Sequence, residues 1–305
     1  YLFGEEKAML EVIEGNPPLP RWFAPYEHGL FATAPQLGWE STAGQGDIAR
    51  AGPNPTLVNN VETLANVPHI LVHGADWFRS RGTEESPGTI VATVVGDVVA
   101  PDVGEVELGT PLRAVIDAVG SGMPEGRSVK AVFSGVANAV VTTSGLDAPV
   151  TYEGLAAVGS GMGSAGFIVY DDTTCMVETA YRFSRFLSIE SCGQCPPCKL
   201  GSSAITTYLE RLETGAGADS DLDGIAAWLT RVTDGNRCYL PVEEQLVVSS
   251  ILRAYPEEFA EHIEGGGCPR PRTLPIPKLV DLAGGHATYD EMFWRKRPDW
   301  TYDAE

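Results

Sequence analysis

The chain has 305 residues, 43% of them hydrophobic, which is enough to build two or three domains with substantial cores. Asp and Glu outnumber Lys and Arg by 41 to 21, and the resulting net charge of −20 would repel a phosphate backbone, which argues against nucleic acid as a partner. The apolar runs are shorter than the roughly 20 residues of a membrane span, and no basic-then-apolar leader opens the sequence, so we expect a globular protein that is neither inserted in a membrane nor exported. The chain begins at Tyr1 rather than at Met, as a piece of a longer protein would.

The first 80 residues contain two segments with helical periodicity. Apolar residues recur at helical spacing over Glu5–Ile13 and over Val61–Arg79, which predicts a helix in each place. Between them, the stretch from Asn16 to Pro55 is long, irregular and rich in Pro and Gly. Such segments are usually either functional or disordered.

β-Branched residues become frequent from Gly88 to Gly145. Runs at 89–99 and 129–143 predict strands, with a predicted helix at 110–119 between them. A Gly-dense passage follows and ends in a predicted short strand, Gly166–Tyr170. These segments predict a small α+β unit.

The last third of the chain is predicted to be helical. Four segments combine apolar residues near helical spacing with Gly or Pro at their junctions: Met176–Ile189, Cys198–Glu213, Leu222–Val232 and Pro241–Ile263. Four helices joined by short links are typical of a bundle. The tail beyond Gly265 is rich in Pro, Arg and Trp and has no steady period, so we expect it to lie over the surface.

Three of the six cysteines crowd into "ESCGQCPPCKLG" at residues 190–201. Cys192, Cys195 and Cys198 have C-x2-C-x2-C spacing, which lets three thiolates converge on one inorganic core, and Cys238 in "GNRCYLP" supplies a fourth after 39 intervening residues. The pattern favours a [4Fe-4S] cluster, which carries single electrons. Structural zinc, which usually takes two separated Cys or His pairs, is a weaker interpretation, and four unrelated core thiols are a third.

The residues around the triplet suit this interpretation. Gly193 permits tight backbone curvature, while Pro196 and Pro197 stiffen the loop and begin the helix that carries Cys198. The first amide groups of that helix are expected to face the negative sulfurs. The two cysteines outside the pattern are interpreted as a small buried hydrophobe, Cys175, and a thiol of the tail, Cys268.

Three motifs together resemble a known family. "YLFGEE" at the start, "NPTLVNNVETLANVPHIL" at 54–71 and the cysteine pattern occur in the order found in the flavin-containing NADH-oxidising subunit of respiratory complex I. The same module is found in the diaphorase subunits of NAD-linked hydrogenases and formate dehydrogenases. The resemblance covers Tyr1 to about Gly265.

The resemblance implies a fold class of α/β plus α+β plus α. Residues 1–86 would be the C-terminal part of a Rossmann-like domain for FMN and NADH, and 87–172 a ubiquitin-like β-grasp domain of SLBB type with its return strand. A four-helix bundle holding the [4Fe-4S] cluster would occupy 173–265, and the tail 266–305. The glycine-rich segment that cradles the FMN phosphate in the family would lie upstream of residue 1.

The resemblance also carries over cofactor-binding positions. Glu5 and Glu6 match an acidic pair near the nicotinamide ribose of bound NADH, with Tyr1 beside them. The positions that contact FMN are matched by four further residues: Asn59, Asn60, Thr63 and Leu240. Taken alone, a Glu pair early in a helix complements the helix dipole and Asn-Asn before a helix is an ordinary cap, so these alternatives stay open.

The function implied is NADH:acceptor oxidoreduction by the complete protein. NADH would reduce FMN, the flavin would reduce the cluster, and a small [2Fe-2S] subunit and a larger Fe-S subunit would take the electrons onward. No side chain is expected to act as a catalytic acid or base, and the 305 residues alone are expected to be inactive. The protein would be cytoplasmic, on the inner face of the membrane through its partner subunits.

Two other functions remain open from the sequence: a flavin-free electron relay or scaffold, and a zinc-stapled binding module. Residues 32–54 form a segment that is only a few residues long in relatives, which suggests a divergent branch with a different partner surface.

Overall fold

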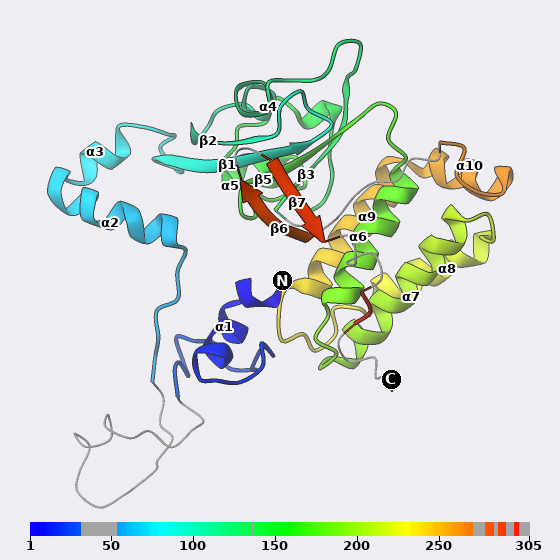
Figure 1. Cartoon of the computed structure of the whole chain (residues 1–305), viewed down its shortest axis with the longest axis horizontal. Coiled ribbons are helices and arrows are strands. Elements are labelled where there is room, and N and C mark those ends of the chain that lie inside the picture. Colours follow the sequence, from blue (N-terminus) through cyan, green and yellow to red (C-terminus); the bar gives the residue numbers. More distant parts are fainter. Residues whose placement is uncertain (32–53, 136, 271–277, 284–285, 291–295, 299–305) are drawn as a thin grey trace, which may run out of the picture.

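The computed structural model describes residues 1–31, 54–135, 137–270, 278–283, 286–290 and 296–298. The segment at 32–54 thus falls outside the described residues except for Asn54. Two bodies dominate the view in Figure 1, a sheet with its helix and a group of helices beside it. The first 80 residues lie against and beyond them.

The N-terminal part is a set of short helices. A 3-10 turn, η1 (Leu2–Gly4), leads into α1 (Glu6–Ile13). The predicted helix over Val61–Arg79 is two helices, α2 (Val61–His73) and α3 (Ala75–Arg79). The break falls at Gly74, whose φ of +87° ends the first helix in a conformation that other residues rarely adopt.

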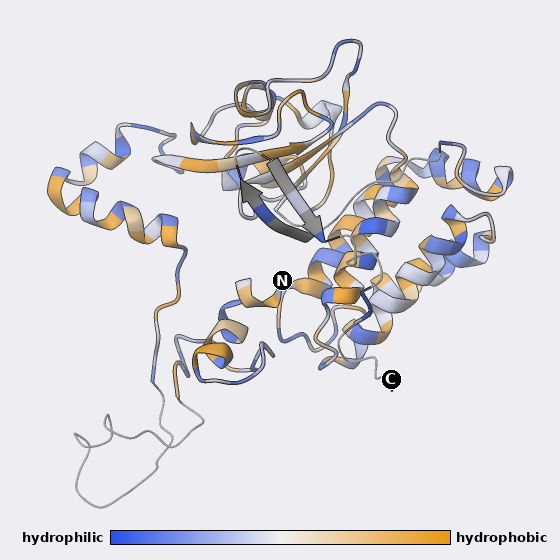
Figure 2. Cartoon of the chain, in the orientation of Figure 1, coloured by the Kyte–Doolittle hydropathy of each residue, from blue (hydrophilic) through white to orange (hydrophobic). Residues whose placement is uncertain are grey.

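Helix α2 buries none of its residues in this chain. Figure 2 shows apolar residues along it, and Val61, Leu71 and Val72 are each more than three quarters exposed. In Figure 1 the helix stands apart from both bodies. A helix of this kind presents an apolar surface that normally contacts another protein segment.

A five-stranded sheet occupies the middle of the chain, with strand order β2-β1-β5-β3-β4. Its strands are β1 (Thr89–Gly96), β2 (Asp102–Glu107), β3 (Val129–Ser134), β4 (Val141–Thr142) and β5 (Gly166–Asp171). β1 and β5 pair in parallel at the centre, and the other neighbours are antiparallel. The helices of this part are α4 (Leu112–Gly120), the 3-10 turn η3 (Thr143–Gly145) and α5 (Tyr152–Ala157).

Alternation along β3 and β5 explains why the sheet separates two cores. Val132 of β3 and Val169 of β5 pack in the cluster that contains α4, whereas Phe133 and Tyr170 pack in the cluster of the helical body. Successive side chains of a strand point to opposite faces, so one sheet covers two hydrophobic cores. The expected small α+β unit is thereby found, with β2 and α5 added to the predicted elements.

The helical body consists of five helices among the described residues. They are α6 (Met176–Glu190), α7 (Pro196–Glu213), α8 (Asp219–Leu229), α9 (Leu240–Ala254) and α10 (Pro256–Gly265). The first three agree with the predicted helices to within three residues. The single helix predicted over Pro241–Ile263 is wrong, because Pro256 cannot continue α9 and begins α10 instead.

The tail contains regular structure that the sequence did not indicate. Strands β6 (Lys278–Ala283) and β7 (His286–Asp290) pair as an antiparallel hairpin. In the part of the chain that the structure describes, no helix combines the length and the apolar character that crossing a bilayer would require.

Candidate functional site

The cysteine triplet lies in the turn that joins α6 to α7. Gly193 has a φ of +73°, so the turn uses the conformational freedom expected of this glycine. Cys195 is the N-cap residue of α7, and Pro196 and Pro197 fill its first two positions. Because prolines have no N–H, the amides expected to face the sulfurs are reduced to those from Cys198 onward.

The structure brings all four predicted cysteines together around one small cavity. Cys192, Cys195 and Cys198 line it from the turn, and Cys238 lines it from the segment just before α9. We call this set of four thiols the thiol cage. The other lining residues are Ser191, Arg237, Leu240 and Pro241.

The thiols are spaced more widely than the ligands of a single metal ion. Four ligands around one tetrahedral zinc have sulfurs about 3.8 Å apart, from Zn–S bonds of about 2.3 Å. Among the described residues, the group whose ligand atoms all lie within 4.8 Å of one another includes none of these four. A cage of this size suits a group with several atoms of its own more than it suits one ion.

Burial controls the protonation of the cage. Removal from water, with a smaller contribution from the neighbouring thiols, raises the pKa of Cys198 to about 12, although a hydrogen bond with Ser191 opposes the shift. Burial likewise raises the pKa of Cys238 to about 11, against the effect of the Leu240 amide. The cysteines therefore hold their protons at neutral pH until a cation makes the thiolate favourable.

Arg237 is a residue of the cage wall that the sequence did not single out. Its guanidinium lies 4.8 Å from the ring centre of Trp22, and Lys7 hydrogen-bonds its backbone carbonyl. The Nε atom is buried and has no hydrogen-bond partner. The arginine thus places a positive charge beside the thiols, and its position directly before Cys238 was the available signal.

A larger cavity of about 440 Å³ shares a wall with the thiol cage. Cys238 and Leu240 line both cavities. Tyr1 and Glu5 also line the larger one, so they meet Leu240 there as the resemblance implied. The other member of the acidic pair, Glu6, is exposed at the start of α1 and does not line this cavity.

Polar contacts hold two carboxylates in place at this cavity. The Tyr1 hydroxyl donates to Glu243 Oε2 at 2.6 Å, and burial raises the pKa of Glu243 while this bond lowers it. Glu5 accepts a hydrogen bond from the Ala8 amide at 2.9 Å, so it does cap α1 as well as line the cavity. The ordinary role and the cavity-facing role coincide in this residue.

A second cavity adjoins the first at Gly163 and Ser164, which line both. Asn60 and Thr63 line this second cavity, and Asn59 does not. Asn60 is the N-cap residue of α2, yet its side chain makes no capping hydrogen bond. The amide is therefore available to a ligand, and simple capping does not explain it.

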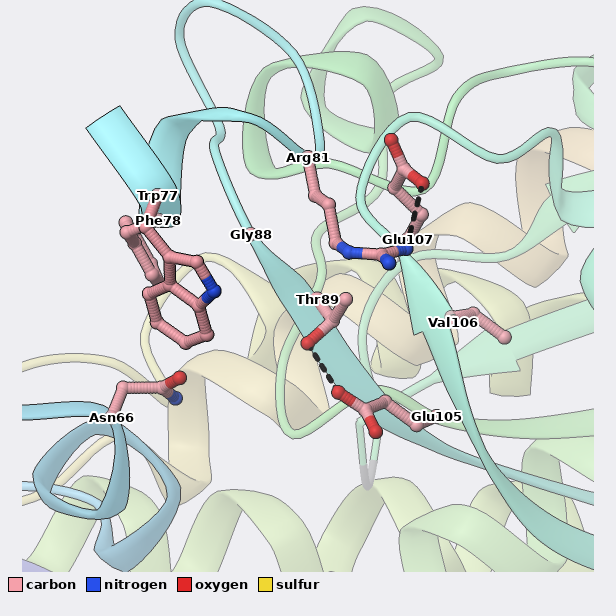
Figure 3. Close-up of a pocket in the computed structure, with 9 residues that line it drawn as sticks. All are labelled: Asn66, Trp77, Phe78, Arg81, Gly88, Thr89, Glu105, Val106 and Glu107. Carbon is pink, nitrogen blue, oxygen red and sulfur yellow. Dashed lines mark hydrogen bonds and ion pairs between the residues drawn. The ribbon is translucent and has the colours of Figure 1, made fainter. Parts of the chain in front are cut away.

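Figure 3 shows a further pocket between α3 and the β1–β2 edge of the sheet. Thr89 donates to Glu105 at 2.5 Å there, and Arg81 lies 3.9 Å from Glu107. None of the predicted site residues lines it. We therefore assign it no role in the site.

Known proteins resemble the chain over most of its length. Residues 178–262 match the NADH-ubiquinone oxidoreductase-F iron-sulfur binding region. A subunit of the NADH-quinone oxidoreductase of Mycobacterium tuberculosis is 36% identical over 270 residues, which are 88% of this chain and 56% of that protein. The HndC subunit of the NADP-reducing hydrogenase of Solidesulfovibrio fructosivorans is 34% identical over 88% of this chain and 51% of its own length.

Solved structures agree with the sequence comparisons. The crystal structure of an NAD+-reducing [NiFe]-hydrogenase in the H2-reduced state superposes with a TM-score of 0.68 and 29% identity, over 88% of this chain and 42% of that one. The chain thus spans little more than half the length of the curated relatives. The resemblance noted in the sequence is confirmed: this chain is a relative of the NADH-oxidising subunits of NADH-quinone oxidoreductases and carries their iron-sulfur binding region.

Proposed function

We propose that the protein is the NADH-oxidising electron-transfer subunit of a multi-subunit redox complex. The observation that carries the proposal is the shared wall: Cys238 and Leu240 line both the thiol cage and the larger cavity. A redox cofactor in the larger cavity would be separated from the cage by the thickness of one residue. Electrons then need no further carrier between the two.

The thiol cage is proposed to hold a [4Fe-4S] cluster through Cys192, Cys195, Cys198 and Cys238. Its four sulfurs, its apolar floor of Leu240 and Pro241 and its width support this assignment. When bound, the cluster supplies one-electron redox chemistry. The protein positions the four thiols, excludes water and places Arg237 where it offsets the negative charge of the sulfurs.

The two larger cavities are proposed to receive FMN and NADH. Thr63 and the two asparagines, Asn59 and Asn60, would pair with the flavin, and Leu240 would pack near its ring. When bound, the flavin accepts a hydride and releases single electrons. Glu5, Glu6 and Tyr1 would bind the nicotinamide ribose, because carboxylates accept hydrogen bonds from hydroxyl groups.

The finer fold assignments belong to the same proposal. Strand order β2-β1-β5-β3-β4 with α4 on one face supports a β-grasp domain of SLBB type over 87–172. Helices α6 to α9 support a four-helix cluster domain over 173–265. The partners would be a small [2Fe-2S] subunit and a larger Fe-S subunit, since relatives are named as subunits of larger enzymes. The complex would bring the chain to the inner face of the membrane.

Cluster binding is tested by anaerobic reconstitution of the full chain with iron and sulfide. Wild type is expected to hold about four irons and four sulfides and to give an EPR signal after reduction. Cys198→Ser and Cys238→Ser should lose both, while Cys268→Ser, outside the cage, should keep them. Zinc without sulfide in the cage, or equal iron loss in all three variants, would contradict the cluster.

Flavin binding is tested separately on the full-length gene product. FMN fluorescence is expected to be quenched on binding, and NADH to bleach the bound flavin. Asn60→Ala should weaken binding more than Asn59→Ala, because Asn60 lines the second cavity and Asn59 does not. A protein that reconstitutes iron but neither binds FMN nor reacts with NADH would be the flavin-free relay.

A further inference from the structure

Four ligand-type side chains meet at the end of the helical body opposite the thiol cage. They are Cys175 at the N-cap of α6, Glu213 at the last position of α7, His262 in α10 and Cys268 just after it. Their ligand atoms all lie within 4.8 Å of one another. Among the described residues this is the one such group.

The group is removed from water. The His262 side chain is fully buried, Cys175 is 1% exposed, and the Glu213 side chain is 15% exposed. Glu213 Oε2 is buried and accepts no hydrogen bond. A buried carboxylate oxygen without a donor is costly unless a positive charge completes its surroundings.

The distances match those around one tetrahedral ion. His262 Nε2 lies 3.3 Å from Cys175 Sγ and 3.3 Å from Glu213 Oε2. Zinc bonds of about 2.3 Å to sulfur, 2.05 Å to nitrogen and 2.1 Å to oxygen would place these pairs about 3.6 and 3.4 Å apart. The side chains therefore need to move only slightly to coordinate a metal.

The histidine is oriented as a metal ligand. Its Nδ1 lies 2.6 Å from the carbonyl oxygen of Glu258, which can only accept, so Nδ1 carries the proton. That leaves the lone pair of Nε2 directed at the group. Metal-bound histidines almost always use their second nitrogen to donate to such an oxygen.

The backbone holds the three helix ends together. The Cys268 amide donates to the Glu213 carbonyl at 3.1 Å, and the Gly267 amide donates to the His262 carbonyl at 3.0 Å. A Cβ on Gly215 would lie 2.1 Å from the Gly266 carbonyl oxygen, so the two loops approach as closely as glycine allows. The fold therefore fixes the group in place before any ligand binds.

We propose that Cys175, Glu213, His262 and Cys268 form a structural zinc site, separate from the thiol cage. Two sulfurs, an imidazole and a carboxylate form a ligand set for a borderline cation, and the sulfurs exclude Mg²⁺ and Ca²⁺. Binding releases one proton from each thiol to solvent. The N-terminus of α6 and the Glu178 amide, 3.5 Å from Cys175 Sγ, stabilise the resulting thiolate.

The geometry does not need the metal to be catalytic. All four positions are supplied by protein, which is typical of structural sites. Without a metal, burial raises the pKa of Cys175 and the nearby Glu213 raises it further. The empty site would thus keep neutral thiols around an unpaired carboxylate, which the metal would correct.

The two sites can be tested independently because they lie far apart. Cys198 and Glu213 stand 15 residues apart on α7, which is about 22 Å at 1.5 Å per residue. The full chain is purified anaerobically, and zinc and iron per chain are measured in wild type and in two matched variants. We expect about one zinc in wild type and in Cys198→Ser, and zinc loss with iron kept in Cys268→Ser.

Spectroscopy on a cage-deficient variant excludes zinc held by the cage. Co²⁺ added to metal-free Cys198→Ser/Cys238→Ser should give the intense visible bands of tetrahedral cobalt and a sulfur-to-cobalt band in the near ultraviolet. His262→Ala in that background should abolish both. This measurement also decides the matter if Cys268→Ser does not fold.

Three results would overturn the proposal. They are zinc content equal in wild type and Cys268→Ser, absence of the tetrahedral cobalt spectrum in the cage-deficient variant, and a Cys175–Cys268 disulfide in anaerobically prepared protein. None of these results bears on the iron content of the cage. Failure of the zinc site and failure of the cluster are therefore distinguishable.

Discussion

Glu244 provides a test of how the helical body treats a buried charge. The side chain is fully buried on α9; Ser184 of α6 donates to its Oε1 at 2.6 Å, while Oε2 has no partner. Burial raises the pKa of this carboxyl from 4.5 to about 8, although the serine opposes the shift. Replacement by Gln keeps the shape and removes the titration.

The sign and size follow from linkage. Between pH 4.5 and 8 the folded protein keeps a proton on Glu244 that the unfolded chain has lost, so the free energy of unfolding falls as pH rises. The fall is about 1.4 kcal/mol per pH unit and at most about 5 kcal/mol over the window. The stabilising contribution is complete below pH 4.5 and lost as pH passes through 8.

The assay is urea unfolding of wild type and Glu244→Gln at several pH values from 4.5 to 8.5. Both proteins carry Cys198→Ser, so that cluster loss does not contribute. The difference in free energy should move in favour of the variant with the stated slope, while the exposed Glu257→Gln serves as a control for the loss of one carboxylate. A flat difference would refute the argument, because it would mean that Glu244 is already ionised in the fold.

Two further predictions concern a tight turn and the cage wall. Gly96→Ala should destabilise the protein by about 3 kcal/mol or more, since Gly96 has a φ of +99° and a Cβ there would lie 2.1 Å from the Val169 carbonyl oxygen. Gly126→Ala, with a φ of +77° and open space around it, should lose only about 1 kcal/mol by thermal unfolding, and equal losses would contradict the contact argument. Arg237→Gln should shift the reduction potential of the reconstituted cluster to more negative values in an EPR-monitored titration, and an unchanged potential would show that this charge does not reach the cage.

The thiol cage could be predicted because its signal is local. Three cysteines at fixed spacing must converge wherever the turn closes, and Cys238 was the remaining cysteine preceded by a helix pair long enough to return the chain. The meeting of Tyr1, Glu5 and Leu240 came from the family resemblance and not from spacing. Glu6 and Asn59 show the limit of such transfer, since neither lines either of the two larger cavities.

The group at the other end could not be predicted from spacing. Cys175, Glu213, His262 and Cys268 come from three helix ends and form no motif, so Cys175 and Cys268 were interpreted as unrelated thiols. The structure corrects this interpretation by placing them together. The only local signal was the glycine run before Cys268, which lets the chain turn back over α7.

Errors in the elements have simple physical causes. The apolar period continues through Gly74 and through the Tyr255–Pro256 step, although the backbone cannot remain helical at either place. Strand β2 reads Asp-Val-Gly-Glu-Val-Glu, which has low strand propensity, and it is fixed by pairing with β1 along its whole length.

The antiparallel pair α6 and α7 is fastened at both tips, by the turn with its cysteines at one end and by the contacts of Cys175 and Glu213 at the other. Such a pair resembles a beam clamped at both supports, in which neither helix can slide along the other without straining both fastenings. Amide hydrogen exchange should accordingly be slowest along these two helices and faster in α2, which has no buried residue to hold it. The segment that carries the cage is then a stiff mount, and the adaptable surface of the molecule lies elsewhere.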